Sequence, residues 1–311
     1  MNHASANADE KVTSTGPRRL WPASVLRVET NLGLRPGGVE RLGEVLLDLG
    51  LAERLGASLA GVVEAPEFDE RRDPEFGARN VPAIAELARR QADRVGEILD
   101  TGKFPVVLGG DDSVLLGCLL ALRQRGSAGL LMLDGHTDYW DLPDGSGELS
   151  DSDLWIATGH GPPVLSDLEG LGPLVSPAAC VVYGHRDRQQ QLEGGSRDVY
   201  REPMLVRNLA ELRAAGIEEA VDHATAFLRA AEAERVWLHL DADCLNDDLM
   251  PAVDWRVTGG LAPEEVIGLA RPLVQSGLVS GIDVTIYNPN LDSDDLPAGR
   301  LLLEVVVSIL T

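Results

Sequence analysis

The sequence predicts an α/β protein built on a doubly wound, mostly parallel sheet. Short apolar runs with the length of strands alternate with longer segments of helical periodicity along most of the chain. The strand-like runs are apolar almost without interruption, as in parallel strands that helices cover on both faces. No internal repeat is visible, and the composition does not shift after the first twenty residues. We therefore expect a disordered tail at 1–20 and a single domain over 21–311, which is long enough to bury a large core.

The elements follow in chain order from these runs and their flanking residues. A helix is expected over 81–101, where a proline suits the first turn, and a strand over 104–108. Two glycines after this strand allow a tight turn into a helix over 113–125. Further helices are expected over 217–232 and over 263–275, where a proline and two glutamates form the first turn. The remaining strands are expected at 129–133, 180–183, 204–206, 236–240 and 281–286.

Charge and cysteine content restrict the partners and the location. The formal net charge of −23 makes nucleic acid and anionic membranes poor partners, because its field repels phosphates. No apolar run reaches membrane-spanning length, and the first residues lack the apolar stretch of a signal peptide. The three cysteines are odd in number and are not spaced as metal ligands, which favours a reducing compartment. We expect a cytoplasmic location.

Three acidic segments follow predicted strands. They are GGDDS at 109–113, LDGHTD at 133–138 and LDADCLNDDLMPA at 240–252. In a doubly wound sheet, ligands bind beyond the carboxyl ends of the strands, where all three segments fall. Acidic side chains that converge there cannot all ionise unless a cation neutralises them. The sequence therefore predicts a metal site.

The spacing of these acids indicates how the site is built. Asp134, His136 and Asp138 follow one strand at intervals of two residues, so all three can turn toward one point. Asp241 and Asp243 have the same spacing, and strand alternation places His239 on the face that they share. Two such groups can hold two ions with bridging carboxylates. Oxygen donors with few imidazoles suit manganese or magnesium better than zinc, and manganese is the first choice.

Several motifs together resemble those of the ureohydrolases, the family of arginase, agmatinase and formiminoglutamase, and are most similar to arginase. GGDDS resembles the family's GGDHS, LDGHTD its DAHxD, and LDADCLNDDLMPAVDWRVTGGL its DxDxxDPxxxPxxGTPxxGGL. NLGLRPGGVE, at 31–40, is similar to a segment near arginase amino termini, and GIDVTIYNP, at 281–289, is similar to LDxxExNP. The resemblance thus extends in order over about 30–290.

The resemblance implies a three-layer α/β/α fold, two Mn²⁺ ions per chain, and hydrolysis of a small-molecule C–N bond by a metal-bridging hydroxide. Carried over by position, Asp134 and Asp241 would bridge both ions, and Asp138 would also orient the hydroxide. Asp138 and Asp112 would complete one site, and His136 and Asp243 the other. Similar family members form trimers or hexamers, so we expect a homo-oligomer. The apolar run at 301–310 could pack on the core or on a neighbouring chain.

Some positions depart from the family pattern. Asp112 stands where the family has a metal-binding histidine, so that site is expected to be weakened or altered and one ion instead of two is an alternative. Helix capping is the structural alternative for Asp112. Ile286 replaces the glutamate that pairs with the guanidinium of the substrate, and an isoleucine cannot accept its hydrogen bonds. Ser150 replaces a proton-shuttling histidine, a role that His160 could take unless it is a solvated loop residue.

The remaining departures concern the outer pocket. Asn246 replaces the third aspartate of DxDxxD, and Gln189 and Leu192 replace acids that hold the α-amino group of the substrate in arginase. His239 is either a buried structural histidine or a replacement catalytic or ligand group. We expect a metal-dependent hydrolase of a guanidino, amidine or related substrate other than plain arginine. The alternatives are a true arginase or agmatinase with a compensated pocket, and a non-catalytic binding or assembly subunit.

Overall fold

The computed structural model describes residues 21–141 and 146–311. The predicted tail at 1–20 lies outside the described residues, and the domain boundary at residue 21 stays a prediction. Eight parallel strands form one sheet in the order β2-β1-β3-β8-β7-β4-β5-β6. In chain order the strands are β1 Ala23–Glu29, β2 Ser58–Glu64, β3 Phe104–Leu108, β4 Ala128–Leu133, β5 Cys180–Tyr183, β6 Leu205–Arg207, β7 Arg235–Asp241 and β8 Val279–Thr285.

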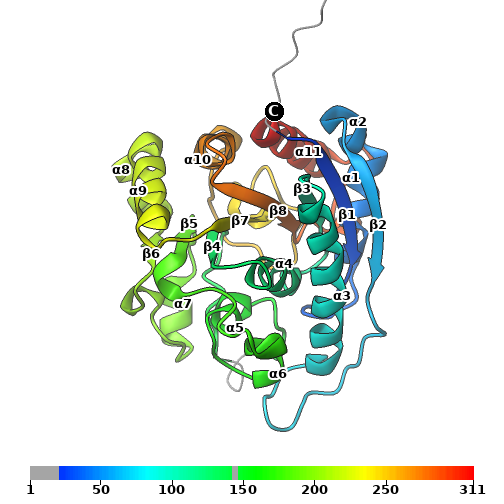
Figure 1. Ribbon diagram of the computed structural model, residues 1–311, viewed down its shortest axis with the longest axis vertical. Coiled ribbons are helices and arrows are strands. Elements are labelled where there is room, and N and C mark those ends of the chain that lie inside the picture. The colour runs from blue at the N-terminus through cyan, green and yellow to red at the C-terminus, as the bar shows by residue number, and fades with distance from the viewer. Residues whose placement is uncertain (1–20, 142–145) are drawn as a thin grey trace, which may run out of the picture.

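Helices cover both faces of the sheet (Figure 1). The core on one face includes residues of α1 Leu42–Asp48, α2 Leu51–Leu55, α8 Leu209–Ala215, α9 Ile217–Ala230, α10 Pro263–Gln275 and α11 Pro297–Leu310. The core on the other face includes residues of α3 Val81–Asp100, α4 Val114–Arg123, α5 Asp153–Ala157 and α6 Pro163–Ser166. A short helix, α7 Arg188–Glu193, follows β5. The predicted three-layer, doubly wound α/β fold is confirmed.

The inner elements lie close to their predicted bounds. Strands β3 and β5 and helix α10 match the expected ranges, and the other predicted strands and helices differ by one to a few residues at their ends. Strands β1 and β2 were not expected. In β2 most side chains are exposed and Gly61 interrupts the run, so this edge strand lacks the continuous apolar pattern of the interior. The run at 301–310 forms most of α11, and Leu302, Val306 and Ile309 are fully buried in the core.

The sheet order brings distant segments together at its centre. β7 and β8 lie between β3 and β4, although they come last in the chain. His239 of β7 pairs in register with Met132 of β4 on one side and with Asp283 of β8 on the other. The turn after β3 approaches the end of β1 so closely that a Cβ at Gly110 would collide with the carbonyl oxygen of Thr30. Glycine is therefore required at this position.

None of the helices in the described part of the chain combines the length and the apolar character needed to cross a bilayer.

Candidate metal centre

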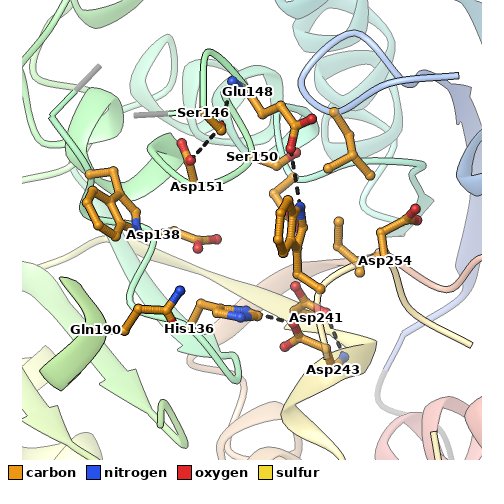
Figure 2. Close-up of a pocket in the computed structure, with 15 residues that line it drawn as sticks. His136, Asp138, Ser146, Glu148, Ser150, Asp151, Gln190, Asp241, Asp243 and Asp254 are labelled. Atoms are coloured by element: carbon orange, nitrogen blue, oxygen red, sulfur yellow. Dashed lines mark hydrogen bonds and ion pairs between the residues drawn. The ribbon is translucent and has the colours of Figure 1, made fainter. Parts of the chain in front are cut away.

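The carboxyl ends of β4 and β7 deliver five of the predicted side chains to one place. Asp134, His136 and Asp138 offer ligand atoms within 4.8 Å of one another, and so do Asp134, Asp241 and Asp243. Asp134 belongs to both groups, so the two sets of ligand atoms adjoin each other. Figure 2 shows His136, Asp241 and Asp243 together beneath the cavity. The structure thus places Asp and His side chains where they can hold metal, as the spacing predicted.

Backbone hydrogen bonds fix these carboxylates. The backbone N–H groups of His136 and Asp243 donate to Asp134 Oδ1 (2.6 Å) and Asp241 Oδ1 (2.7 Å). The N–H of Gly135 donates to Asp243 Oδ1 at 2.9 Å, which ties the loop after β4 to the loop after β7. Asp243 Oδ2 lies 2.7 Å from His136 Nδ1. The cluster is therefore preorganised by its own loops.

The electrostatics of the cluster require positive charge. Burial, followed by repulsion between neighbouring carboxylates, raises the pKa of Asp138 and Asp241 well above the usual aspartate value. Burial and the charge of Asp243 raise the pKa of Asp134 to about 7. Burial alone would lower the pKa of His136, but the charge and hydrogen bond of Asp243 raise it to about 10. A divalent cation would supply the charge that these groups otherwise obtain by holding protons.

Asp112 and His239 occupy the deeper part of the same region. Neither residue is in either group of close ligand atoms; Asp112 is 2% exposed and His239 is fully buried. His239 Nε2 lies 3.6 Å from Asp112 Oδ1 and 3.8 Å from Asp134 Oδ2. None of these three atoms has a hydrogen-bond partner within the described part of the chain. Unpaired buried polar atoms are costly, so their convergence fits a cation-binding site.

Sequence reasoning missed two acids beside this region. Asp283 of β8 accepts hydrogen bonds from His239 Nδ1 at 2.6 Å and from Trp237 Nε1. Asp153, at the start of α5, is fully buried, and both of its carboxylate oxygens lack a hydrogen-bond partner among the described residues. A charged residue inside the apolar run 279–285 was a usable signal for Asp283, because buried charges are rare unless they are paired. No local signal identified Asp153.

A cavity of about 900 Å³, counting open solvent at its mouth, lies above the cluster. The residues that line it come from the metal cluster and from the surrounding loops: Leu34, Asp112, His136, Asp138, Trp140, Ser146, Glu148, Ser150, Asp151, Gln190, Asp241, Asp243, Asp254, Trp255 and Ile286. Figure 2 shows Glu148 and Asp151 on its upper side, Gln190 on the left and Asp254 on the right. Glu148 Oε2 accepts a hydrogen bond from Trp255 Nε1 at 3.2 Å.

The two positions expected to change the chemistry both face this cavity. Ile286 lies on its wall with a φ of 66°, in the left-handed region that β-branched residues rarely adopt. Ser150 also lines it, and its buried Oγ has no hydrogen-bond partner among the described residues. An apolar side chain and a hydroxyl thus stand where the pattern of the resembled family has a glutamate and a histidine.

Two of the predicted catalytic residues do not line the cavity. The ring of His160 stacks on Trp155 with centroids 3.8 Å apart, and its Nδ1 lies 3.3 Å from Thr158 Oγ1. His239 lies below the cavity wall, against Asp283. This placement favours packing for His160 and leaves His239 beside Asp112, Asp134 and Asp283. Of the three, Asp138 alone faces the cavity.

An eight-stranded α/β/α sheet with an aspartate-rich cluster at its carboxyl edge offers the ligands that a metal-dependent hydrolase needs. The arginase family model matches residues 13–311. The chain is 27% identical over 293 residues to the arginase of Bacillus subtilis, covering 92% of this chain and 97% of that protein. The chain belongs to the arginase family of metal-dependent C–N hydrolases.

Solved structures agree with this assignment. The arginase of Bacillus caldovelox superimposes with a TM-score of 0.82 at 24% identity, over 94% of this chain and 98% of that chain. The proclavaminate amidino hydrolase of Streptomyces clavuligerus superimposes with a TM-score of 0.68 at 18% identity, over 94% and 91%. At these identities the likeness establishes the shared fold.

Proposed function

We propose that this protein hydrolyses a C–N bond in a guanidino, amidine or related substrate other than plain arginine. The observation that carries the proposal is Ile286, an apolar side chain on the wall of the cavity above the carboxylate cluster. The cluster supports the hydrolytic chemistry of the family, whereas the isoleucine cannot pair with a guanidinium group. These two observations therefore fit an enzyme that keeps the reaction of the family and acts on a different substrate.

The proposed metal is manganese, with two ions per chain. Asp134 and Asp241 would be shared between them, with His136 and Asp243 on one side and Asp138 and Asp112 on the other. Carboxylate oxygens with few imidazoles suit this ion better than zinc. When bound, the two cations would lower the pKa of water and stabilise the negative charge that develops on the substrate.

Asp138 and the cavity wall would supply the rest of the chemistry. Asp138 is 4% exposed and faces the cavity, so its carboxylate is placed to accept a proton from the attacking water and to return it to the leaving nitrogen. Glu148, Asp151 and Asp254 give the upper cavity an acidic character that favours a cationic substrate. Ile286 would contact an uncharged or apolar part of that substrate.

The proposal is tested by screening manganese-loaded protein against guanidino, amidine and formimino compounds, with urea and ammonia as the measured products. We expect turnover of at least one of these compounds, little turnover of arginine, and a loss of at least 100-fold in Asp138→Asn. An enzyme that carries two ions and turns over none of these compounds would contradict the proposal.

Two alternatives are distinguished by the same samples. The position of Glu148 and Asp254 on the cavity wall favours an arginase or agmatinase with a compensated pocket, which would release urea efficiently from arginine or agmatine. The absence of Asp112 from the two groups of close ligand atoms favours a non-catalytic binding subunit, which would retain less than one ion per chain after manganese loading.

We also propose a cytoplasmic homo-oligomer, a trimer or a hexamer. The family resemblance supports the assembly, and the three cysteines, all free and buried, support a reducing compartment. Analytical ultracentrifugation would give the mass of the assembly, and a monomer at micromolar concentration would contradict this part of the proposal.

A further inference from the structure

We propose that His239 replaces the imidazole that is missing at position 112 and binds the same ion as Asp112, with Asp283 orienting its ring. This inference rests on the proposed metal-dependent function and deepens it, because it moves one ligand from the loop after β3 into strand β7. It also makes Asp283 a positioning residue.

The first argument is the geometry around Nε2. His239 lies two residues before Asp241 on β7, so both side chains leave the same face of the sheet. Nε2 lies 3.6 Å from Asp112 Oδ1 and 3.8 Å from Asp134 Oδ2, which is too far for hydrogen bonds. Two atoms that bind one ion at roughly 2.1 Å each lie about 3 to 4 Å apart. Each of these two distances therefore matches a pair of ligands that share an ion, and the pair of Nε2 with Asp112 Oδ1 is the one that the inference uses.

The second argument is the state of the ring. Asp283 Oδ2 lies 2.6 Å from Nδ1, and a carboxylate is an acceptor, so Nδ1 carries the hydrogen. In the neutral ring, Nε2 then carries no hydrogen, and its lone pair is available to bind a metal ion. His239 is fully buried, and Nε2 has no hydrogen-bond partner among the described residues. Trp237 Nε1 holds the other oxygen of Asp283. A metal-binding histidine commonly donates its second N–H to a carboxylate in this way.

The third argument is the number of negative charges around the ring. Asp112, Asp134 and Asp283 all lie within 4.0 Å of a ring nitrogen of His239. Asp153 is a further fully buried acid, and both of its carboxylate oxygens lack a hydrogen-bond partner among the described residues. A divalent cation bound by Nε2 and the neighbouring carboxylates would offset this concentration of acidic groups.

The test compares His239→Asn with the native chain in the absence of substrate. The side-chain amide of asparagine can still donate a hydrogen bond to the buried carboxylate of Asp283. It has no atom in the place of Nε2, so the proposed metal ligand is lost. We expect the variant to lose one ion per chain by elemental analysis, or to bind manganese at that site at least 10- to 100-fold more weakly by calorimetry. The visible absorption of the Co²⁺-loaded protein should also change, because one nitrogen ligand is lost.

A second variant and a control keep the outcome decisive. Asp112→His combined with His239→Asn should recover the lost ion, since the imidazole then enters from the loop after β3. His185→Asn removes another fully buried imidazole, which faces Asp187 and Tyr200, and should leave the metal content unchanged. Circular dichroism establishes folding of each variant. If His239→Asn does not fold, the double variant decides, because metal recovery supports the inference and its absence overturns it.

The inference and the proposed function fail in different ways. Unchanged metal content, affinity and Co²⁺ absorption in folded His239→Asn would overturn the ligand role and identify His239 as a charged structural partner of the aspartates. A native chain with two ions and no turnover would instead overturn the proposed reaction and leave the ligand assignment intact. If the native chain binds a single ion, its loss in His239→Asn supports the inference and its retention overturns it.

Discussion

Ile286 adopts an unusual backbone conformation at the edge of the cavity. Its φ of 66° lies in a region that costs a β-branched residue on the order of 1–3 kcal/mol. Its N–H donates to the carbonyl oxygen of Gly110 at 2.8 Å, which ties the end of β8 to the turn after β3. The backbone here is set by the contact between two loops, so the side chain at 286 can change while its direction into the cavity is retained.

Restoring the acid at this position should restore recognition of a guanidinium group. Ile286→Glu in manganese-loaded protein is expected to raise kcat/KM for arginine or agmatine by 10-fold or more, because a buried carboxylate pairs with the cation. Urea release is the measurement. Ile286→Gln is the matched control, since it has the same shape without the charge and should give a much smaller gain. Equal gains in both variants would show that charge at this position is not what limits arginine hydrolysis.

Residues also differ in how much of their role the sequence revealed. Spacing alone predicted that Asp134, His136, Asp138, Asp241 and Asp243 converge, because each group follows one strand and parallel strands end at one edge. The partnership of His239 with Asp283 depends on the register between β7 and β8, which no local pattern encodes. Asp153 reaches the region through the loop that precedes α5, whose path a single sequence does not give.

At the scale of elements, the central strands and long helices were predictable and the outer ones were not. Strands β3 and β5 are buried on both faces and appear as uninterrupted apolar runs, and the interior of β7 is apolar except for His239. In the edge strand β2, apolar and polar residues do not alternate regularly and most side chains are exposed, so its sequence resembles that of a loop. Helix α11 was visible as an apolar run, but its packing against α10 required the tertiary structure.

Because one side of α11 is buried and the other is exposed, substitutions on the two sides should change the free energy of unfolding by different amounts. Leu302→Ala is expected to reduce the free energy of unfolding by about 2–5 kcal/mol, because it leaves a cavity in the core. Glu304→Ala, two residues further on the exposed side, removes a surface ion pair with Arg54 and should cost less than about 1 kcal/mol. Urea denaturation measures both. Similar values for the two variants would contradict the packing of α11 described above.

At the scale of the whole molecule, stability is linked to pH and to metal. Without a cation, the pKa of Asp134 is raised to about 7, so its ionisation is less favourable in the folded state than in the unfolded state. His136 has a raised pKa of about 10, so the stability it contributes is complete below about pH 6.5 and is lost as the pH rises toward 10. Burial alone would raise the pKa of Asp243, but the charge of His136 lowers it, so the contribution of Asp243 changes only below about pH 4 and leaves this trend unaltered.

The metal-free protein should therefore become less stable as the pH rises from 5 to 8, by an amount on the order of a few kcal/mol. Manganese should raise Tm, and the rise should be larger at pH 8 than at pH 5, because the ion competes with protons for the same ligands. Differential scanning calorimetry with chelator or with manganese checks both statements. A rise in Tm that is independent of pH would indicate an ion bound away from these ligands.

The order of the strands also determines when the site can form during synthesis. β7 and β8 leave the ribosome last, yet they occupy the middle of the sheet, between β3 and β4. The earlier part of the chain cannot complete its sheet until these two strands insert, and a structure dominated by such distant pairings is expected to fold slowly. Asp241, Asp243 and Asp283 arrive with them, so a chain that stops before β7 lacks two of the five residues with close ligand atoms. The ability to bind metal thus marks a chain that has been made and folded at least through β8.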